Sequence, residues 1–190
     1  MPTDNIAKVY LLKRPFDFSL ALIGLTLTFP IWSLIVLLVW LEGGRSIFYV
    51  QERVGRNSVL FKAIKFRTMG YRKNMSRLAK FLRATALDEL PQLINIIKGE
   101  MSFVGPRPLI PQEIRVNEEF KLRSAVLPGL TGSAQVLVAK DAPVLEKLNY
   151  DIAYIKKQNI ALDILLILKS FGISLNRKWD IINNGLKMNL

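Results

Sequence analysis

The sequence predicts an α+β fold that is associated with a membrane, and three observations lead to this class. An uncharged apolar segment covers residues 18–41, which as a helix is long enough to cross a bilayer. Residues 59–66, VLFKAIKF, alternate in the manner of a short strand. Helical periodicity follows in residues 72–83 and in the apolar run that begins at Leu90. We therefore expect an N-terminal membrane helix joined to a small globular part that contains strands.

The composition limits the chemistry that is available to the chain. Its 190 residues predict one domain, with at most a short appendage, and a net charge of +12 accompanies 51% apolar residues. This combination is typical of proteins at a membrane surface. The sequence has no histidine and no cysteine, which excludes Ser-His-Asp and Cys-His triads, disulfides, and zinc sites with nitrogen or sulfur ligands. An enzyme with this composition would use Asp, Glu, Lys, Tyr, Ser or Thr, and a metal would be a hard ion such as Mg²⁺.

The path of the apolar segment through the membrane has two readings. Pro30 lies near its middle and is expected to bend or break the helix. The flanking basic residues are Lys8, Lys13 and Arg14 before the segment and Arg45, Arg53 and Arg56 after it. Because basic flanks prefer the cytoplasmic side, both ends favour the same side of the membrane. A re-entrant helix-break-helix hairpin satisfies both ends, and a simple spanning helix is the alternative.

Residues 45–83 form a strongly basic stretch, with eleven Lys or Arg against one acid, Glu52. Such a stretch binds nucleic acid or anionic lipid, or lines a pocket for a polyphosphate substrate. Alternation along residues 59–66 places Lys62 and Lys65 on opposite faces of the expected strand. For most of these cations, the simplest expectation is a solvated position towards acidic lipid headgroups.

Asp88 and Glu89 stand directly before an apolar periodic run, and Pro91 is compatible only with the first turn of a helix. The pair is therefore expected at a helix N-terminus, where the simplest role is capping. The functional reading is that a carboxylate kept ionised there is a nucleophile, while its neighbour holds Mg²⁺ or takes a proton. Two prolines flank Arg107 in the segment GPRP and pre-order its guanidinium for phosphate binding. Cations around two carboxylates suit phosphoryl transfer.

Five segments together resemble the monotopic phosphoglycosyl transferases, bacterial enzymes that begin glycoconjugate assembly on polyprenol phosphate. The segments are KRPFDFSLALIGL…FP (13–30), SIFYVQERVGRNSVLFKAIKFRTM (46–69), LDELPQLINIIKGEMSFVGPRPL (87–109), LPGLTGSAQV (127–136) and YDIAYIKKQNIALDILLILKS (150–170). They cover nearly the whole chain, and the length resembles that of the family's minimal catalytic form.

The resemblance implies a re-entrant hairpin broken near Pro30 in residues 1–44 and a catalytic domain in residues 45–190. Interfacial amphipathic helices would hold that domain at the cytoplasmic face of the bacterial inner membrane. It implies transfer of a sugar-1-phosphate from a UDP-sugar to polyprenol (undecaprenyl) phosphate, with release of UMP through a covalent aspartyl intermediate. The partners implied are these two substrates and membrane lipid, with no nucleic acid, and a homodimer is compatible with the family.

By the same resemblance, Asp88 is the nucleophile, and Glu89 and Asp88 are the Mg²⁺ ligands. The expected substrate-binding residues are Lys62, Lys65, Arg67, Arg83, Arg107 and Asp163. After AQV, many members continue with Asn-Gly-Arg, whereas this chain has Leu137, Val138 and Ala139, followed by Lys140. Two other functions stay open: a glycosyl transferase that makes a polyprenol monophosphate sugar and releases UDP, and a non-catalytic basic binding protein anchored at the membrane.

Overall fold

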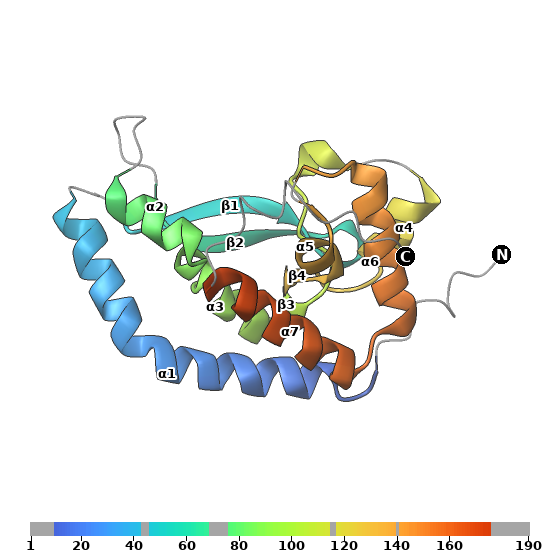
Figure 1. The fold of residues 1–190 in the computed structure, drawn as a ribbon, viewed down its shortest axis with the longest axis horizontal. Coiled ribbons are helices and arrows are strands. Elements are labelled where there is room, and N and C mark those ends of the chain that lie inside the picture. Colours follow the sequence, from blue (N-terminus) through green and yellow to red (C-terminus); the bar gives the residue numbers. More distant parts are fainter. Residues whose placement is uncertain (1–9, 43–45, 69–75, 115–116, 140, 176–190) are drawn as a thin grey trace.

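A long helix, α1 (Lys13–Leu41), runs along one side of the molecule (Figure 1). The computed structural model describes residues 10–42, 46–68, 76–114, 117–139 and 141–175. Within these residues, α1 is the one helix long and apolar enough to cross a membrane, and most of its apolar surface is exposed. The α+β class is confirmed, with this apolar helix attached to small sheets and short helices.

The helix α1 continues through Pro30 and bends along its length, as Figure 1 shows. The expected helix-break-helix is therefore a bend within one helix. Proline has no N–H to donate to the preceding turn, which favours bending at this position. The hydroxyls of Thr28 and Ser33 donate to the carbonyl oxygens of Gly24 and Phe29, at 2.6 and 3.2 Å, and such back-bonding accommodates a bend. Whether the helix enters and leaves on one side of a membrane stays a prediction.

An antiparallel hairpin of β1 (Phe48–Val54) and β2 (Leu60–Phe66) packs on the helices. The strand expected in residues 59–66 is confirmed. Phe61 and Ala63 of β2 are buried in a core with Ala21 of α1 and residues of α3 (Gln92–Lys98), because alternate strand residues face the same side. The N-terminal half of α1 and the globular part therefore share one hydrophobic core.

Between the hairpin and α3 lie two short elements that carry the candidate chemistry. Helix α2 (Arg77–Ala84) begins where the hydroxyl of Ser76 accepts a hydrogen bond from the Ala79 amide, at 3.0 Å. It confirms the described part of the helix expected in residues 72–83; residues 69–75 lie outside the described residues. The 3-10 helix η3 (Leu87–Glu89) follows, ahead of α3.

A second, parallel pair of strands joins β3 (Ser102–Val104) to β4 (Gly129–Thr131). The glycines here allow very close backbone approach: a Cβ on Gly129 would lie 2.1 Å from the amide nitrogen of Gly105. The amide of Gly105 donates to the carbonyl oxygen of Thr131 at 2.9 Å. The segment that contains Arg107 is thereby fixed against the loop that follows β4.

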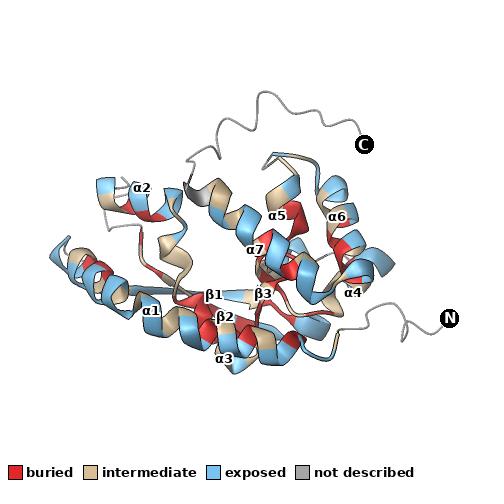
Figure 2. Cartoon of the chain, turned by 60° about the horizontal axis from the view of Figure 1, so that its bottom comes forward, coloured by how far each residue is buried: buried red, intermediate tan, exposed pale blue. Residues whose placement is uncertain are grey.

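The remaining helices are η2 (Arg56–Ser58) and η4 (Pro111–Glu113), both 3-10, and α4 (Glu118–Ser124), α5 (Ser133–Leu137), α6 (Val144–Lys157) and α7 (Ile160–Leu175). Of these, α7 packs against both strands of this second sheet. Helix α7 buries Leu166 but exposes Ile164, Leu165 and Leu168. Figure 2 shows exposed surface along both α1 and α7. This exposed apolar face of α7 favours a position at a membrane interface over burial in the protein core. The division of the chain at residue 44 stays a prediction.

Candidate active site

The carboxylates of Asp88 and Glu89, here called the carboxylate pair, lie in the turn η3 and not at the start of α3. The helix begins at Gln92, its N-cap is Pro91, and no side chain caps it. The expected capping role of Asp88 is therefore wrong. Ala86, which precedes η3, has a left-handed conformation with φ of +57°. This conformation is less favourable for a non-glycine residue by roughly 1 kcal/mol, and such strained residues are more frequent at functional sites.

The pKa of Asp88 is raised to about 6, first by burial and then by the negative charge of Glu89. The positive charges of Lys65 and Arg83 act in the opposite direction. The sequence predicts that a helix N-terminus keeps this carboxylate ionised. The structure corrects this, because Asp88 precedes the helix and is half-buried. With a pKa of about 6, the Asp88 carboxylate is still mostly ionised at pH 7.

Lys65 forms an ion pair with Glu89, and both side chains are largely buried. Lys65 lies near the end of β2, on the same face as Phe61 and Ala63, so the strand that builds the core also delivers this cation. Two polar contacts hold α3 under the strand: Asn95 Nδ2 donates to the Lys62 carbonyl oxygen at 2.8 Å, and the Ile64 amide donates to Asn95 Oδ1 at 3.2 Å. The structure places Lys65 beside the carboxylate pair, and its expected role in substrate binding stays a prediction.

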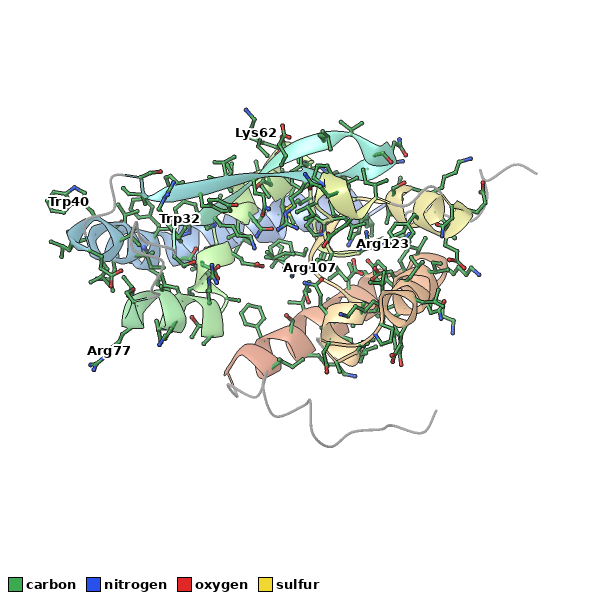
Figure 3. The ribbon with its side chains drawn as sticks, turned by 90° about the horizontal axis from the view of Figure 1, so that it is seen from above. Trp32, Trp40, Lys62, Arg77, Arg107 and Arg123 are labelled. Carbon is green, nitrogen blue, oxygen red and sulfur yellow. The ribbon has the colours of Figure 1, made fainter. Side chains whose placement is uncertain are left out.

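Arg83 and Arg67 have different surroundings. Arg83 Nε donates to the hydroxyl of Thr68 at 2.8 Å, and its charge lowers the pKa of Asp88. Arg67 Nε is buried and has no hydrogen-bond partner among the described residues. Lys62 does not join the site: its side chain is exposed, and Figure 3 shows it at the outer edge of the hairpin, pointing away from Arg107. The structure therefore does not bring Lys62 to the carboxylate pair.

A small hollow beside the carboxylate pair is lined by Lys65, Glu89, Arg53, Arg107 and Gln135. The side chain of Arg107, which lies between two prolines, is exposed. Arg53 Nη1 donates to the carbonyl oxygen of Pro108 at 3.0 Å, and burial together with the charge of Arg107 lowers the pKa of Arg53. Two guanidinium groups at the rim of one hollow favour an anion between them.

Sequence reasoning missed Arg53 and Gln135 as site residues. The hairpin register pairs Arg53 with Phe61, so Arg53 shares the face of Lys65. A hairpin turn near Asn57 is the signal in the sequence that predicts this pairing. No comparable local signal marks Gln135, which reaches the hollow from α5.

Asp163 lies elsewhere, in a fully buried cluster. It forms an ion pair with Lys13 and accepts hydrogen bonds from the hydroxyls of Tyr10 and Tyr154, both at 2.7 Å. Asp163 is fully buried, and both of its carboxylate oxygens already have partners in this cluster. The structure gives it the role of joining α7 to α1, in place of the expected substrate contact. Lys140 lies outside the described residues.

The carboxylate pair fits the requirements of Mg²⁺, although the described residues hold no group of three or more His, Cys, Asp or Glu. Protein sites for Mg²⁺ in phosphoryl transfer supply one or two carboxylates, and water and substrate phosphates complete the coordination. Adjacent Asp88 and Glu89 provide that donor set. A magnesium site here stays a prediction.

Comparison with known proteins decides the family. The family model described as bacterial sugar transferase matches residues 8–177, nearly the whole chain. The chain is a bacterial sugar transferase. Relatives of this family carry the names of sugar-phosphate transferases, and the chain is accordingly an enzyme of the phosphoglycosyl transferase type.

Three relatives illustrate the match of this bacterial sugar transferase. It is 34% identical to the exopolysaccharide production protein ExoY of Sinorhizobium fredii, over 83% of each chain. It is 34% identical to the UDP-galactose-lipid carrier transferase of Erwinia amylovora, over 92% of this chain and 43% of that one. The identity is again 34% to the UDP-glucose:undecaprenyl-phosphate glucose-1-phosphate transferase of Escherichia coli, over 83% of this chain and 39% of that one. The chain thus spans most of ExoY and less than half of the other two.

Proposed function

We propose that this sugar transferase moves a sugar-1-phosphate from a UDP-sugar to polyprenol phosphate, releasing UMP and forming a polyprenol diphosphate sugar. The observation that carries the proposal is Asp88: a half-buried carboxylate with a pKa of about 6, close to the charges of Lys65 and Arg83. A carboxylate that is ionised yet poorly solvated is a competent nucleophile at neutral pH. The names of the relatives from Erwinia amylovora and Escherichia coli support nucleotide-sugar and undecaprenyl phosphate substrates.

The transfer proceeds in two displacement steps at one phosphorus. A carboxylate oxygen of Asp88 attacks the phosphorus that bears the sugar, the bond from that phosphorus to the UMP oxygen breaks, and UMP leaves with the bonding electrons. A phosphate oxygen of polyprenol phosphate then attacks the same phosphorus, and the bond to Asp88 breaks. The carboxylate is restored, and the two steps use one pocket.

The cations around the hollow bind and neutralise the phosphates in this proposal. Arg53 and Arg107 flank the hollow, and Lys65 and Arg83 act on the carboxylate pair itself. Mg²⁺ held by Asp88 and Glu89 would supply further charge neutralisation at the phosphate oxygens. Glu89, already paired with Lys65, orients that cation towards the reacting groups.

The second substrate is a lipid, and the exposed apolar surfaces of α1 and α7 provide the membrane contact that it needs. We place the enzyme at the cytoplasmic face of the bacterial inner membrane, with α1 as a re-entrant hairpin whose two basic flanks stay on one side. The bend of α1 at its centre supports this path. A homodimer stays a prediction.

The test is UMP release by detergent-purified protein with undecaprenyl phosphate and a panel of UDP-sugars, alongside mass spectrometry of enzyme quenched during turnover. We expect UMP as the leaving nucleotide and a sugar phosphate added to the peptide that contains Asp88. Asp88→Asn should abolish both signals, while Asp141→Asn, at an exposed position, should keep them.

Release of UDP in place of UMP would establish the glycosyl transferase that makes a monophosphate sugar. Turnover without any covalent adduct would refute the nucleophile. Salt-sensitive lipid binding, with no turnover for any UDP-sugar and no effect of Asp88→Asn, would favour the binding protein.

A further inference from the structure

The side-chain oxygen of Gln135 is a buried acceptor without a donor. Gln135 lies in the short helix α5, three residues after Gly132, which caps the start of that helix. Its Oε1 atom is inaccessible to solvent and receives no hydrogen bond from any residue that the structure describes. A buried amide oxygen left in this state costs roughly 1–3 kcal/mol, so a group that supplies a donor is expected.

The orientation of this amide is fixed by its other end. Gln135 Nε2 donates to the carbonyl oxygen of Leu130 at 3.3 Å. A carbonyl oxygen only accepts, so the amide nitrogen must face Leu130 and the oxygen must face the other way. Gly132 leaves space for it: a Cβ at that position would lie 3.3 Å from Gln135 Oε1.

For two neighbours of Gln135 in the hollow, the hydrogen bonds that the structure records go to other acceptors. Lys65 is paired with Glu89. The guanidinium of Arg53 donates to the carbonyl oxygen of Pro108 and, at 2.7 Å, to Gln51 Oε1. Phosphate oxygens are acceptors and do not bind a carbonyl oxygen, so the cations and Gln135 recognise different parts of a ligand. The partner of Gln135 must carry an O–H or N–H group.

We propose that Gln135 is a specificity-determining residue whose Oε1 accepts a hydrogen bond from a hydroxyl group of the transferred sugar. This rests on the proposed function. The phosphorus attacked by Asp88 carries the sugar directly, and Gln135 lines the same hollow as Glu89, the neighbour of that nucleophile. Sugar hydroxyls are therefore the nearest donors, ahead of those of the uridine.

The experiment pairs a variant with substrate analogues in the UMP-release assay. The parent substrate is UDP-glucose or UDP-galactose, whichever the wild type turns over. The probes are the analogues of this substrate that each lack one sugar hydroxyl, and one analogue with deoxyuridine in place of uridine. The variant is Gln135→Met, which is similar in length but has no carbonyl, and the control is Gln112→Met at an exposed position of η4. Thermal unfolding in detergent tests whether each variant is folded.

In wild type and in Gln112→Met, removing one particular sugar hydroxyl should lower kcat/KM by roughly 10- to 100-fold. With the parent sugar, kcat/KM of Gln135→Met should already be lower than that of wild type by a similar factor. Removing that hydroxyl from the substrate should then lower kcat/KM of this variant by less than about threefold, because the amide oxygen that accepted its hydrogen bond is absent. A merely structural role for Gln135 would lower activity equally for all analogues.

The inference is overturned if no sugar hydroxyl shows this coupling, or if only the deoxyuridine counterpart does. Should Gln135→Met not fold, Gln135→Asn replaces it, since it keeps the amide but withdraws the oxygen by one methylene. Wild type that fails to release UMP from any UDP-sugar contradicts the proposed function, whereas active wild type without coupling contradicts only the role of Gln135.

Discussion

The ion pair between Lys65 and Glu89 joins the last part of strand β2 to the turn that carries Asp88. It places a negative and a positive charge beside Asp88, because Glu89 raises the pKa of Asp88 and Lys65 lowers it. The pair also fixes the position of both groups, since each side chain is mostly buried. Each partner can therefore be removed separately, with opposite expected consequences for the ionisation of Asp88.

The first prediction concerns the pH dependence of kcat/KM. Attack requires the ionised carboxylate, so kcat/KM should rise with pH and level off above a midpoint near 6. Lys65→Met removes a positive charge that favours ionisation and should move the midpoint to higher pH. Glu89→Gln removes a negative charge that opposes ionisation and should move it to lower pH. Lys156→Met, at an exposed position of α6, is the control. Equal midpoints in wild type and Lys65→Met would contradict this electrostatic account.

The second prediction concerns Arg53 at the rim of the hollow. Arg53→Lys keeps the positive charge but loses the planar fork that contacts Pro108 and Gln51, so kcat/KM should fall by roughly tenfold or more. Arg77→Lys on α2 should leave it unchanged, because Arg77 points away from the molecule in Figure 3. UMP release measures both. If kcat/KM of Arg53→Lys matched that of wild type, Arg53 would not be part of the proposed phosphate-binding site.

The third prediction concerns Asn95, whose exposed fraction is 0%. Its side chain contacts the backbone of Lys62 and Ile64 and donates to Glu100 Oε2 at 2.6 Å. Asn95→Leu leaves those buried groups without partners and should lower the free energy of unfolding by about 3 kcal/mol, or the Tm by roughly 10 °C. Asn149→Leu, exposed on α6, is the control. A Tm within about 2 °C of wild type would show that these contacts contribute little.

The fourth prediction concerns Lys13, a buried cation between Asp163 and Asp17. Lys13→Met leaves two buried carboxylates without a counter-charge and should cost roughly 3–5 kcal/mol of stability. The double variant Lys13→Met with Asp163→Leu should recover part of this loss, because one uncompensated charge is also removed. Thermal unfolding in detergent measures the three proteins. A double variant no more stable than Lys13→Met would contradict this account of uncompensated charge.

The fifth prediction tests the membrane path. The chain has no cysteine, so single cysteines placed at Asn5 and at Asn57 are unique labelling sites. A re-entrant helix keeps both ends inside the cell, and both sites should resist a membrane-impermeant thiol reagent in intact cells. Both should react after lysis, which is the control. Labelling of the Asn5 site alone in intact cells would establish a spanning helix.

Local patterns in the sequence identified much of the architecture. The apolar composition of residues 18–41 and the alternation of residues 59–66 report burial and exposure along a single element, and the structure has a helix and a strand there. The adjacency of Asp88 and Glu89 is also local, whereas their closeness to Lys65 depends on how the strand and the turn pack together. What the sequence misjudged is equally specific: the helix begins after the carboxylate pair, at Gln92.

Composition and periodicity by themselves identified a long apolar helix, a basic stretch and two adjacent carboxylates. Each of these features depends only on residues that are near one another along the chain. The tertiary structure alone decided that Asp163 is buried against Lys13, that Lys62 faces outward, and that Arg53 and Gln135 meet at one hollow. These relationships join residues far apart in the sequence. They depend on which surfaces pack together, and packing is settled by the whole set of long-range contacts.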